Sequence, residues 1–361
     1  MSLDKFLELP PYSLRREEKD ALFLEQMKEL TAFHSENCSV YSRILKAEGF
    51  TGSDSMEKVE DVPFLPVSLF KTQELVSVPQ EQITRTMTSS GTTGQQVSRV
   101  FLDAVTAKDQ TRVLAKIIAS FIGSARLPLL ILDSKLAVRD RRLFSARGAG
   151  IMGFSVFGRD TTYALGENME LNADAVAAFC DKYKGGPVLL FGYTFMIWKH
   201  FYLVLKQKGI KVDLGEDSTL FHVGGWKKLK DMAVDTETYK RSLLEQAGIR
   251  RVYDYYGMAE QLGSIFVACE EGHLHASIYS DVITRSPLDL RPCDIGETGI
   301  LQVMSVLPHS YPGHSLLTED EGVVLGVDDC PCGRKGKYFA IHGRLKNAEI
   351  RGCSDTYASN F

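Results

Sequence analysis

Apolar runs that alternate with helical patterns constrain the fold of residues 104–256 more than any other feature of the sequence. Each run has the length of a buried strand, and the segments between the runs carry apolar residues at helical spacing. Such alternation predicts a mostly parallel sheet with helices on its faces. The predicted strands of this part are Pro128–Leu132, Val188–Phe191, Thr219–Val223 and Ile249–Tyr256. After Ser264 short strands follow at close spacing, which predicts a β-rich subdomain with strands at Ser264–Ala268, Ser277–Thr284, Gly299–Val306 and Val323–Val327.

The composition excludes several classes of protein. The 361 residues include 42 Lys and Arg against 46 Asp and Glu, so the net charge of −4 gives no sign of a nucleic-acid partner. Apolar residues at 44% and charged residues at 24% exclude a collagenous or mainly disordered chain. No apolar run reaches the roughly 18 residues of a membrane span and the start lacks a signal sequence, so we expect a cytoplasmic protein. Seven cysteines argue against a disulfide framework and favour free thiols or metal ligands.

A loop rich in hydroxyls and glycines lies between the extended segments Ile83–Met87 and Val97–Leu102. Glycine lets backbone N–H groups approach an anion closely, and hydroxyl groups add hydrogen-bond donors. The loop therefore predicts a phosphate-binding site, and a polar hairpin turn is the alternative. It is not a P-loop, because the lysine of that motif is missing. Its residues are Thr88, Ser89, Ser90, Gly91, Thr92, Thr93 and Gly94.

Four further fragments follow this loop in the chain. They are a glycine turn at Val223–Lys227, an aromatic-Gly-x-x-Glu segment at Tyr253–Gln261, a Thr-Glu-Asp element at Thr318–Asp320 and a Gly-Arg pair at 343–344. In this order the five fragments resemble the signatures of the adenylate-forming superfamily, which includes acyl-CoA synthetases and luciferases. The resemblance implies that the chain binds ATP and Mg²⁺.

The resemblance also implies roles for individual residues. The ring of Tyr256 lies along adenine and Glu260 reaches the magnesium of ATP, which is sensible because a π face suits a purine and a carboxylate suits a hard cation. Without the resemblance, Tyr256 would be a core residue and Asp320 would lie in a solvated turn. The other implied nucleotide-binding residues are Gly224 and Gly225 beside adenine, Gly257 and Met258 in the same segment as Tyr256, and Asp320 and Arg344 at the ribose.

Two pairs of metal-ligand residues lie in the β-rich part. Cys269 and His275 are separated by five residues, and Cys330 and Cys332 by one. Three thiolates and one imidazole complete a tetrahedral zinc shell with no position left for water. The pattern resembles a zinc site in relatives of phenylacetate-CoA ligase and implies a structural Zn²⁺. His273 as the imidazole, Cys293 as a ligand, or unpaired thiols beside an unrelated histidine are the alternatives.

The end of the chain differs from the usual superfamily pattern. There the Gly-Arg pair precedes a hinge and a small C-terminal domain with a catalytic lysine, whereas here 17 residues follow Arg344, so we expect that domain to be absent. Cys353 lies in this short arm. Truncation and thiol together resemble the LuxE-like acyl-protein synthetases, over nearly the whole chain. Those proteins activate a fatty acid as acyl-AMP and transfer the acyl group to their own cysteine near the C-terminus, from which a partner reductase makes aldehyde. A tail thiol without function is the alternative for Cys353.

Another residue must replace the missing lysine. Lys227 or Lys228, directly after the glycine turn, is predicted to offset charge on the α-phosphate or on the attacking carboxylate. His222 is a candidate contact for the substrate carboxylate, with a core histidine as the alternative. Residues 191–198 either line the acyl pocket or form ordinary helix core.

We therefore expect an α/β protein with the N-terminal core of an adenylate-forming enzyme, built from mixed or parallel sheets with flanking helices and a β-rich subdomain. The predicted ranges are 1–50 for a helical segment, 51–263 for the adenylation core, 264–342 for the β-rich subdomain with zinc, and 343–361 for the arm with Cys353. The expected activity is ATP-dependent transfer of a carboxylic acid, by way of acyl-AMP, to Cys353 for a partner reductase or transferase. The alternatives are a ligase that passes the acyl group to coenzyme A or a carrier protein, and a non-catalytic nucleotide-binding scaffold.

Overall fold

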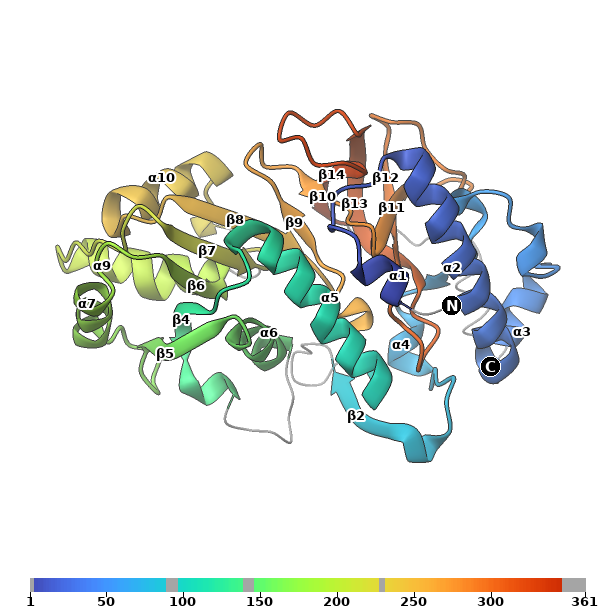
Figure 1. The fold of residues 1–361 in the computed structure, drawn as a ribbon, viewed down its shortest axis with the longest axis horizontal. Coiled ribbons are helices and arrows are strands. Elements are labelled where there is room, and N and C mark those ends of the chain that lie inside the picture. The colour runs from blue at the N-terminus through green and yellow to red at the C-terminus, as the bar shows by residue number, and fades with distance from the viewer. Residues whose placement is uncertain (1–2, 89–96, 139–145, 227–230, 346–361) are drawn as a thin grey trace. The chain divides into compact units, whose positions relative to one another are not determined.

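The computed structural model describes residues 3–88, 97–138, 146–226 and 231–345 (Figure 1). The chain divides into two compact units. The continuous unit comprises residues 118–256, and the discontinuous unit comprises residues 1–117 and 257–361. The four ranges expected from the sequence stay a prediction. Among the helices of the described residues, none combines the length and the apolar character needed to cross a membrane.

A five-stranded parallel sheet forms the centre of the continuous unit, which confirms the parallel sheet that the alternating pattern predicted, although one strand, at 158–165, was not among the predicted strands. Its strands lie in the order β8-β7-β6-β4-β5, so the first strand of the unit in chain order lies inside the sheet. Because the strands are parallel, their carboxyl ends meet at one edge, where α/β proteins bind ligands. The strands are β4 (Leu127–Ser134), β5 (Gly158–Leu165), β6 (Val188–Tyr193), β7 (Ser218–Val223) and β8 (Arg251–Tyr256).

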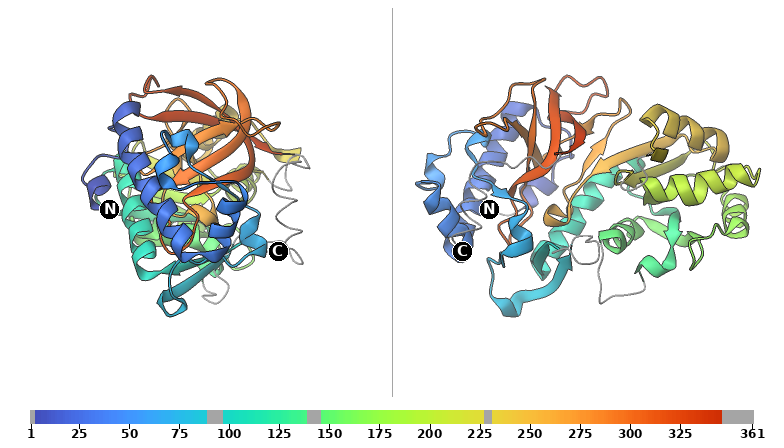
Figure 2. Two further views of the ribbon diagram at one scale, coloured as in Figure 1. Left: turned by 90° about the vertical axis from the view of Figure 1, so that its right-hand side faces the viewer. Right: turned by 180° about the vertical axis from the view of Figure 1, so that it is seen from behind.

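Helices cover both faces of this sheet (Figure 2). One face packs on α7 (Ala173–Lys182), on α10 (Thr236–Ala247) and on the segment 194–207, which comprises α8 (Thr194–Met196), a π-helix (Ile197–Tyr202) and α9 (Leu203–Gln207). On the other face, Phe154 of α6 (Ala146–Ser155) stacks on Phe191 of β6 at 4.2 Å between ring centroids. The start of α7 is capped by Asn172, whose side chain accepts a hydrogen bond from the Ala175 backbone N–H at 3.0 Å.

The discontinuous unit contains a mainly antiparallel sheet in the order β11-β12-β13-β14-β10-β9, with the short β1 parallel to β13. A separate hairpin of β2 and β3 precedes α5. The strands are β1 (Leu65–Pro66), β2 (Ile83–Thr88), β3 (Arg99–Asp103), β9 (Phe266–Ala268), β10 (Leu274–His275), β11 (Ser280–Arg285), β12 (Thr298–Ser305), β13 (Ser315–Val327) and β14 (Lys337–Arg344). The helices are α1 (Asp4–Leu7), α2 (Arg16–Asn37), α3 (Ser39–Ala47), α4 (Leu69–Thr72) and α5 (Ala104–Ile122), which runs into the continuous unit.

Several strands of this sheet differ from the sequence-based expectation, and the short β1 and β10 were not predicted. β13 begins at Ser315 instead of Val323, and β14 was not predicted. The acidic run in the middle of β13 has the composition of a turn, but the register pairs Asp320 with Arg344 of β14. Pairing between two strands that are close in space therefore outweighs the low strand propensity of acidic residues.

A buried group of three charged side chains attaches α2 to the sheet. The Lys19 ammonium lies 3.1 Å from one carboxylate oxygen of Asp281 on β11, and the Lys337 ammonium lies 2.7 Å from the other oxygen. All three side chains are at least 92% buried. A buried charge without its partner is costly, so this contact fixes the position of α2 against β11 and β14.

Two buried histidines form a second link between α2 and the sheet. The rings of His34 on α2 and His314 stack at 5.0 Å, and both side chains are inaccessible to solvent. His34 donates from Nε2 to the Pro308 carbonyl at 3.0 Å and accepts at Nδ1 from the Ser77 hydroxyl at 2.7 Å. Burial lowers the pKa of His34 well below its usual value and that of His314 to about 3. Both rings are therefore neutral in the folded protein.

We expect this pair to make the fold sensitive to acid. The unfolded chain takes up protons on histidine below about pH 6.5, whereas the folded protein does not. The contribution of the neutral pair to stability is therefore fully present above that pH and is lost as the pH falls toward the lower folded-state pKa. The free energy of unfolding is measured by chemical denaturation at pH 7 and at pH 5. Its decrease between the two pH values should be about 2 kcal/mol smaller for His34→Gln than for wild type. His342→Gln, which changes an exposed histidine, is the control. An identical loss in His34→Gln and wild type would contradict this account.

Candidate functional site

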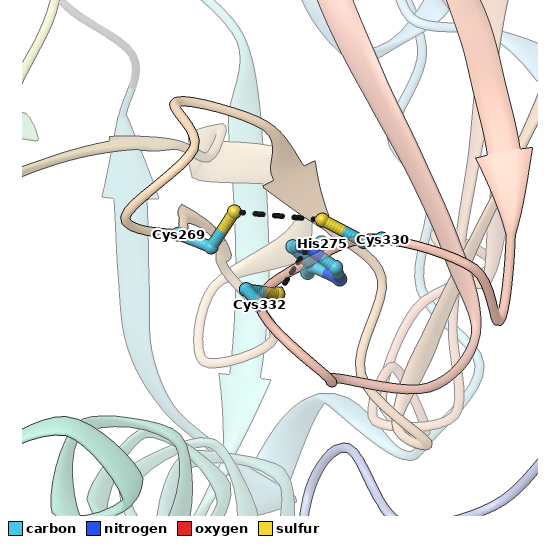
Figure 3. Close-up of side chains that lie close together, drawn as sticks. All are labelled: Cys269, His275, Cys330 and Cys332. Atoms are coloured by element: carbon cyan, nitrogen blue, oxygen red, sulfur yellow. Dashed lines mark hydrogen bonds between the residues drawn. The ribbon is translucent and has the colours of Figure 1, made fainter.

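The four residues predicted to bind metal come together in the discontinuous unit (Figure 3). Cys269 follows β9, His275 ends β10, and Cys330 and Cys332 lie in the turn between β13 and β14. Their candidate ligand atoms all lie within 4.8 Å of one another. The Sγ atoms of Cys269 and Cys330 are 3.9 Å apart, and Sγ of Cys332 is 3.4 Å from Nε2 of His275. We call these four residues the Cys₃His cluster.

Tight turns present the thiols of the Cys₃His cluster. The Gly272 N–H donates to the Cys269 carbonyl at 2.9 Å, and the Gly333 N–H donates to the Cys330 carbonyl at 2.9 Å. Both glycines have φ near +80°, a backbone conformation that other residues rarely adopt. The short Cys-x-Cys spacing thus becomes a knuckle that points two sulfur atoms inward.

The dimensions of the cluster fit zinc. With Zn–S bonds of about 2.3 Å and a Zn–N bond of about 2.0 Å, neighbouring donor atoms of a tetrahedral site lie about 3.5–3.8 Å apart. The separations of 3.9 Å and 3.4 Å quoted above are close to these values. Three sulfur donors and one imidazole also match the preference of zinc over calcium or magnesium, which require oxygen ligands.

Electrostatics at His275 and Cys332 agree with the same assignment. Burial lowers the pKa of His275 to about 4, so the imidazole is neutral and has a lone pair for a metal. Burial raises the pKa of Cys330 to about 12, whereas hydrogen bonds from Arg334 outweigh burial at Cys332 and lower its pKa. Arg334 also forms an ion pair with Glu270 at 2.6 Å. Its positive charge would offset part of the negative charge of three thiolates.

His273 lies beside the cluster and not within it. Its Nδ1 atom is 3.4 Å from Sγ of Cys330, and its ring stacks on Tyr338 at 5.0 Å. This position suits a hydrogen bond to a thiolate ligand. In many metal sites such hydrogen bonds orient the residues that bind the metal. Cys293, the other alternative ligand, lies outside the cluster.

Glu260, the predicted ligand of magnesium in the nucleotide site, lies among the residues that the structure describes. It lies in a short 3₁₀ turn, and the residue is only 6% exposed. Among the described residues, no lysine or arginine forms an ion pair with it. Buried carboxylates are normally paired, so the absence of an ion pair at Glu260 among the described residues agrees with the predicted role of a cation ligand.

Close packing fixes the backbone around Glu260. Gly263 has φ +94°, and a Cβ atom there would lie 2.6 Å from Cα of Gln110 on α5. The Gln261 amide donates to the carbonyls of Val303 and Gly313 at 3.1 and 2.8 Å. Neither Gln261 nor Gly313 was predicted to matter, because their contact joins residues 52 positions apart and has no local sequence signal.

The flanks of the hydroxyl-rich loop form the hairpin of β2 and β3, with Thr88 paired to Arg99. Thr88 ends β2, whereas residues 89–94, which include Ser89, Ser90, Gly91, Thr92, Thr93 and Gly94, lie outside the described residues. Lys227, Lys228 and Cys353 also lie outside them. Their predicted roles stay predictions.

In the continuous unit, the predicted adenine residues lie at the ligand-binding edge of the parallel sheet. Gly224 and Gly225 follow the carboxyl end of β7, and Tyr256 ends the neighbouring β8. Gly224 has φ +83°, which a turn directly after a strand requires of glycine. Gly257 and Met258 continue the chain toward Glu260 and belong to the discontinuous unit.

Asp320 and Arg344, the predicted ribose residues, lie side by side on β13 and β14. The Arg344 Nε atom is 3.7 Å from Oδ1 of Asp320, and the arginine side chain is 78% exposed. A carboxylate with a neighbouring exposed cation is a suitable acceptor for a pair of hydroxyls. The structure thus brings together two residues that are 24 positions apart in the sequence.

His222 and the segment 191–198 pack as core. The His222 ring nitrogen Nδ1 is 2.9 Å from the Thr194 hydroxyl, and burial lowers the pKa of His222 to about 3. Phe191 and Ile197 are inaccessible to solvent, and Trp198 is buried against Tyr202 and Tyr239. The core interpretation of both features therefore agrees with the structure.

Comparison with known proteins gives the family. The model of a family described as "Acyl-protein synthetase, LuxE" matches residues 2–361. A long-chain-fatty-acid–luciferin-component ligase of Vibrio harveyi is 22% identical over 94% of this chain and 90% of its own length. A protein of the same name from Aliivibrio fischeri is 23% identical over 85% of this chain and 80% of its own length.

Among solved structures, an open form of 2-hydroxyisobutyryl-CoA ligase in complex with 2-HIB-AMP and CoA is similar in fold. It has a TM-score of 0.71 and 17% identity over 93% of this chain and 77% of the ligase. This likeness confirms the expected α/β fold of adenylate-forming ligases. Since the family match spans the chain from residue 2 to residue 361, the protein belongs to the LuxE family of acyl-protein synthetases and is a ligase.

Proposed function

We propose that the chain activates a long-chain fatty acid with ATP and then holds the acyl group on its own Cys353. In the first step, a carboxylate oxygen attacks the α-phosphorus, and the bond to pyrophosphate breaks. In the second step, the Cys353 thiolate attacks the acyl carbon, and AMP leaves with the electrons of the broken C–O bond. The thioester keeps the acyl group reactive toward a partner reductase or transferase.

Several observations support this proposal. The one that carries most is the family match to residue 361, because it includes the arm with Cys353. The buried Glu260, without an ion pair among the described residues, is a second. The names of the relatives from Vibrio harveyi and Aliivibrio fischeri support a long-chain fatty acid as the substrate.

Different residues bind the phosphates, the metal and the nucleoside in this proposal. Residues 88–94 hold the phosphates by backbone N–H and hydroxyl donors, and Glu260 holds Mg²⁺, which offsets charge on the phosphates when bound. Lys227 or Lys228 neutralises the charge that builds up as the carboxylate approaches the α-phosphate. The nucleoside is held by Tyr256 with Gly224, Gly225, Gly257 and Met258 at adenine, and by Asp320 and Arg344 at the ribose.

Two other functions are the alternatives. A ligase that passes the acyl group to coenzyme A or a carrier protein needs the same nucleotide site but not Cys353. A nucleotide-binding scaffold needs neither the acid nor the thiol. The three functions therefore differ in whether pyrophosphate is released and in where the acyl group goes.

Intact masses after incubation with ATP, magnesium and fatty acids of increasing length test the proposal. Wild type should gain one acyl group that hydroxylamine removes, and Cys353→Ala should gain none while it still releases pyrophosphate. Cys293→Ala, which changes a half-buried thiol elsewhere, is the matched control and should behave as wild type. Transfer to added coenzyme A by wild type and Cys353→Ala alike would favour the ligase, and no pyrophosphate with any acid would favour the scaffold.

We also propose that the Cys₃His cluster binds one structural Zn²⁺. Protein purified without chelator should contain about one zinc per chain, measured by elemental mass spectrometry. Cys332→Ser should reduce the zinc content to below about a tenth and lower the melting temperature, because metal binding contributes to folding. Cys293→Ser should keep the metal. A metal-free wild type, or Cys332→Ser with full zinc, would contradict the assignment.

A further inference from the structure

The loop of residues 308–314 is in direct contact with the backbone of Glu260. The hydroxyl of Tyr311 donates a hydrogen bond to the Glu260 carbonyl at 2.9 Å. Tyr311 is inaccessible to solvent, and its ring packs edge-on against Phe70 at 6.0 Å between centroids. A Cβ atom on Gly313 would overlap the Tyr311 ring and lie 3.0 Å from the same carbonyl oxygen. The contact between the loop and Glu260 is therefore both specific and tightly packed.

The same loop also holds the hairpin that flanks the hydroxyl-rich loop. The Ser310 hydroxyl donates to the Phe101 carbonyl of β3 at 2.8 Å, and the Ser310 N–H donates to the Thr106 hydroxyl at 3.1 Å. Thr106 lies in the first turn of α5, and its backbone N–H donates to the Asp103 carboxylate at 2.8 Å. One short loop thus fixes both Glu260 and the strand that leads away from residues 88–94.

The 308–314 loop is itself anchored in the core of the unit. At one end, the Pro308 carbonyl accepts a hydrogen bond from His34, and at the other end His314 stacks on the same ring. Nε2 of His314 is 3.0 Å from the Thr31 hydroxyl and 3.3 Å from the Tyr41 hydroxyl. Because both ends are fixed to α2 and α3, the loop has little freedom to follow a movement of Glu260.

We propose that Tyr311 is a positioning residue for Glu260. It acts through the backbone carbonyl and does not touch the substrate. Removal of its hydroxyl leaves a buried carbonyl without that donor, so the turn of residues 259–261 relaxes and the carboxylate moves from the place where it holds the metal. This inference rests on the proposed role of Glu260 as the ligand of Mg²⁺.

Tyr311→Phe tests the inference by the magnesium dependence of pyrophosphate release. The loss of one hydrogen bond should raise the magnesium concentration at half-maximal rate about tenfold, while the rate at saturating magnesium and the KM for the acid change less than about twofold. A role in folding alone would not separate these quantities. Gln261→Met, which removes the other clamp on the turn, should shift the magnesium dependence in the same direction.

Tyr279→Phe is the matched control. Tyr279 is also fully buried in the same unit, and its hydroxyl donates to a backbone carbonyl, that of Phe6, at 3.3 Å. This variant should keep the wild-type magnesium dependence. A Tyr311→Phe protein that folds, by circular dichroism, and has the same magnesium dependence as Tyr279→Phe overturns the positioning role.

Direct binding separates this inference from the proposed function. Calorimetric titration with ATP and Mn²⁺ as the probe needs no turnover. If wild type binds the metal nucleotide but releases no pyrophosphate with any acid, the proposed function fails. Weaker binding by Tyr311→Phe than by Tyr279→Phe would then still support the positioning role, and equal binding would overturn it.

Discussion

The hydrogen bonds of the 308–314 loop are the interactions on which the discontinuous unit depends. This loop contacts α2 through the two stacked histidines, β3 and α5 through Ser310, and the turn of Glu260 through Tyr311. These partners come from three separate parts of the chain, because β3 and α5 are contiguous. The packing of the unit and the position of its candidate magnesium ligand therefore have a common physical origin.

The buried polar groups of this unit act in three different ways. Lys19 and Lys337 share the carboxylate of Asp281, and these ion pairs attach α2 to the sheet. The two stacked histidines are held neutral by burial. Glu260 has no ion pair among the described residues, and it is the buried carboxylate that best suits an external cation. Burial alone thus does not mark a functional residue.

Part of this structure could be predicted from the sequence. Four of the five parallel strands were recognised because their apolar runs are buried on both faces, and β5 was missed because it lacks such a run. The Cys₃His cluster followed from the close spacing of its two pairs. The first half of β13 was missed because its acidic run has the composition of a turn, whereas β14 was missed although Tyr338, Phe339 and Ile341 favour a strand. The support of Glu260 by Tyr311 was missed because it joins residues 51 positions apart, and only the fold makes them neighbours.

We propose above all that the site around Glu260 forms an acyl adenylate. Acid-dependent exchange of labelled pyrophosphate into ATP measures that step alone, because it needs no acyl acceptor. Wild type and Cys353→Ala should both exchange, and Glu260→Gln should lose at least about 100-fold of the rate, since the isosteric amide cannot supply the charge. Absence of acid-dependent exchange in wild type, or full exchange in Glu260→Gln, would contradict the account.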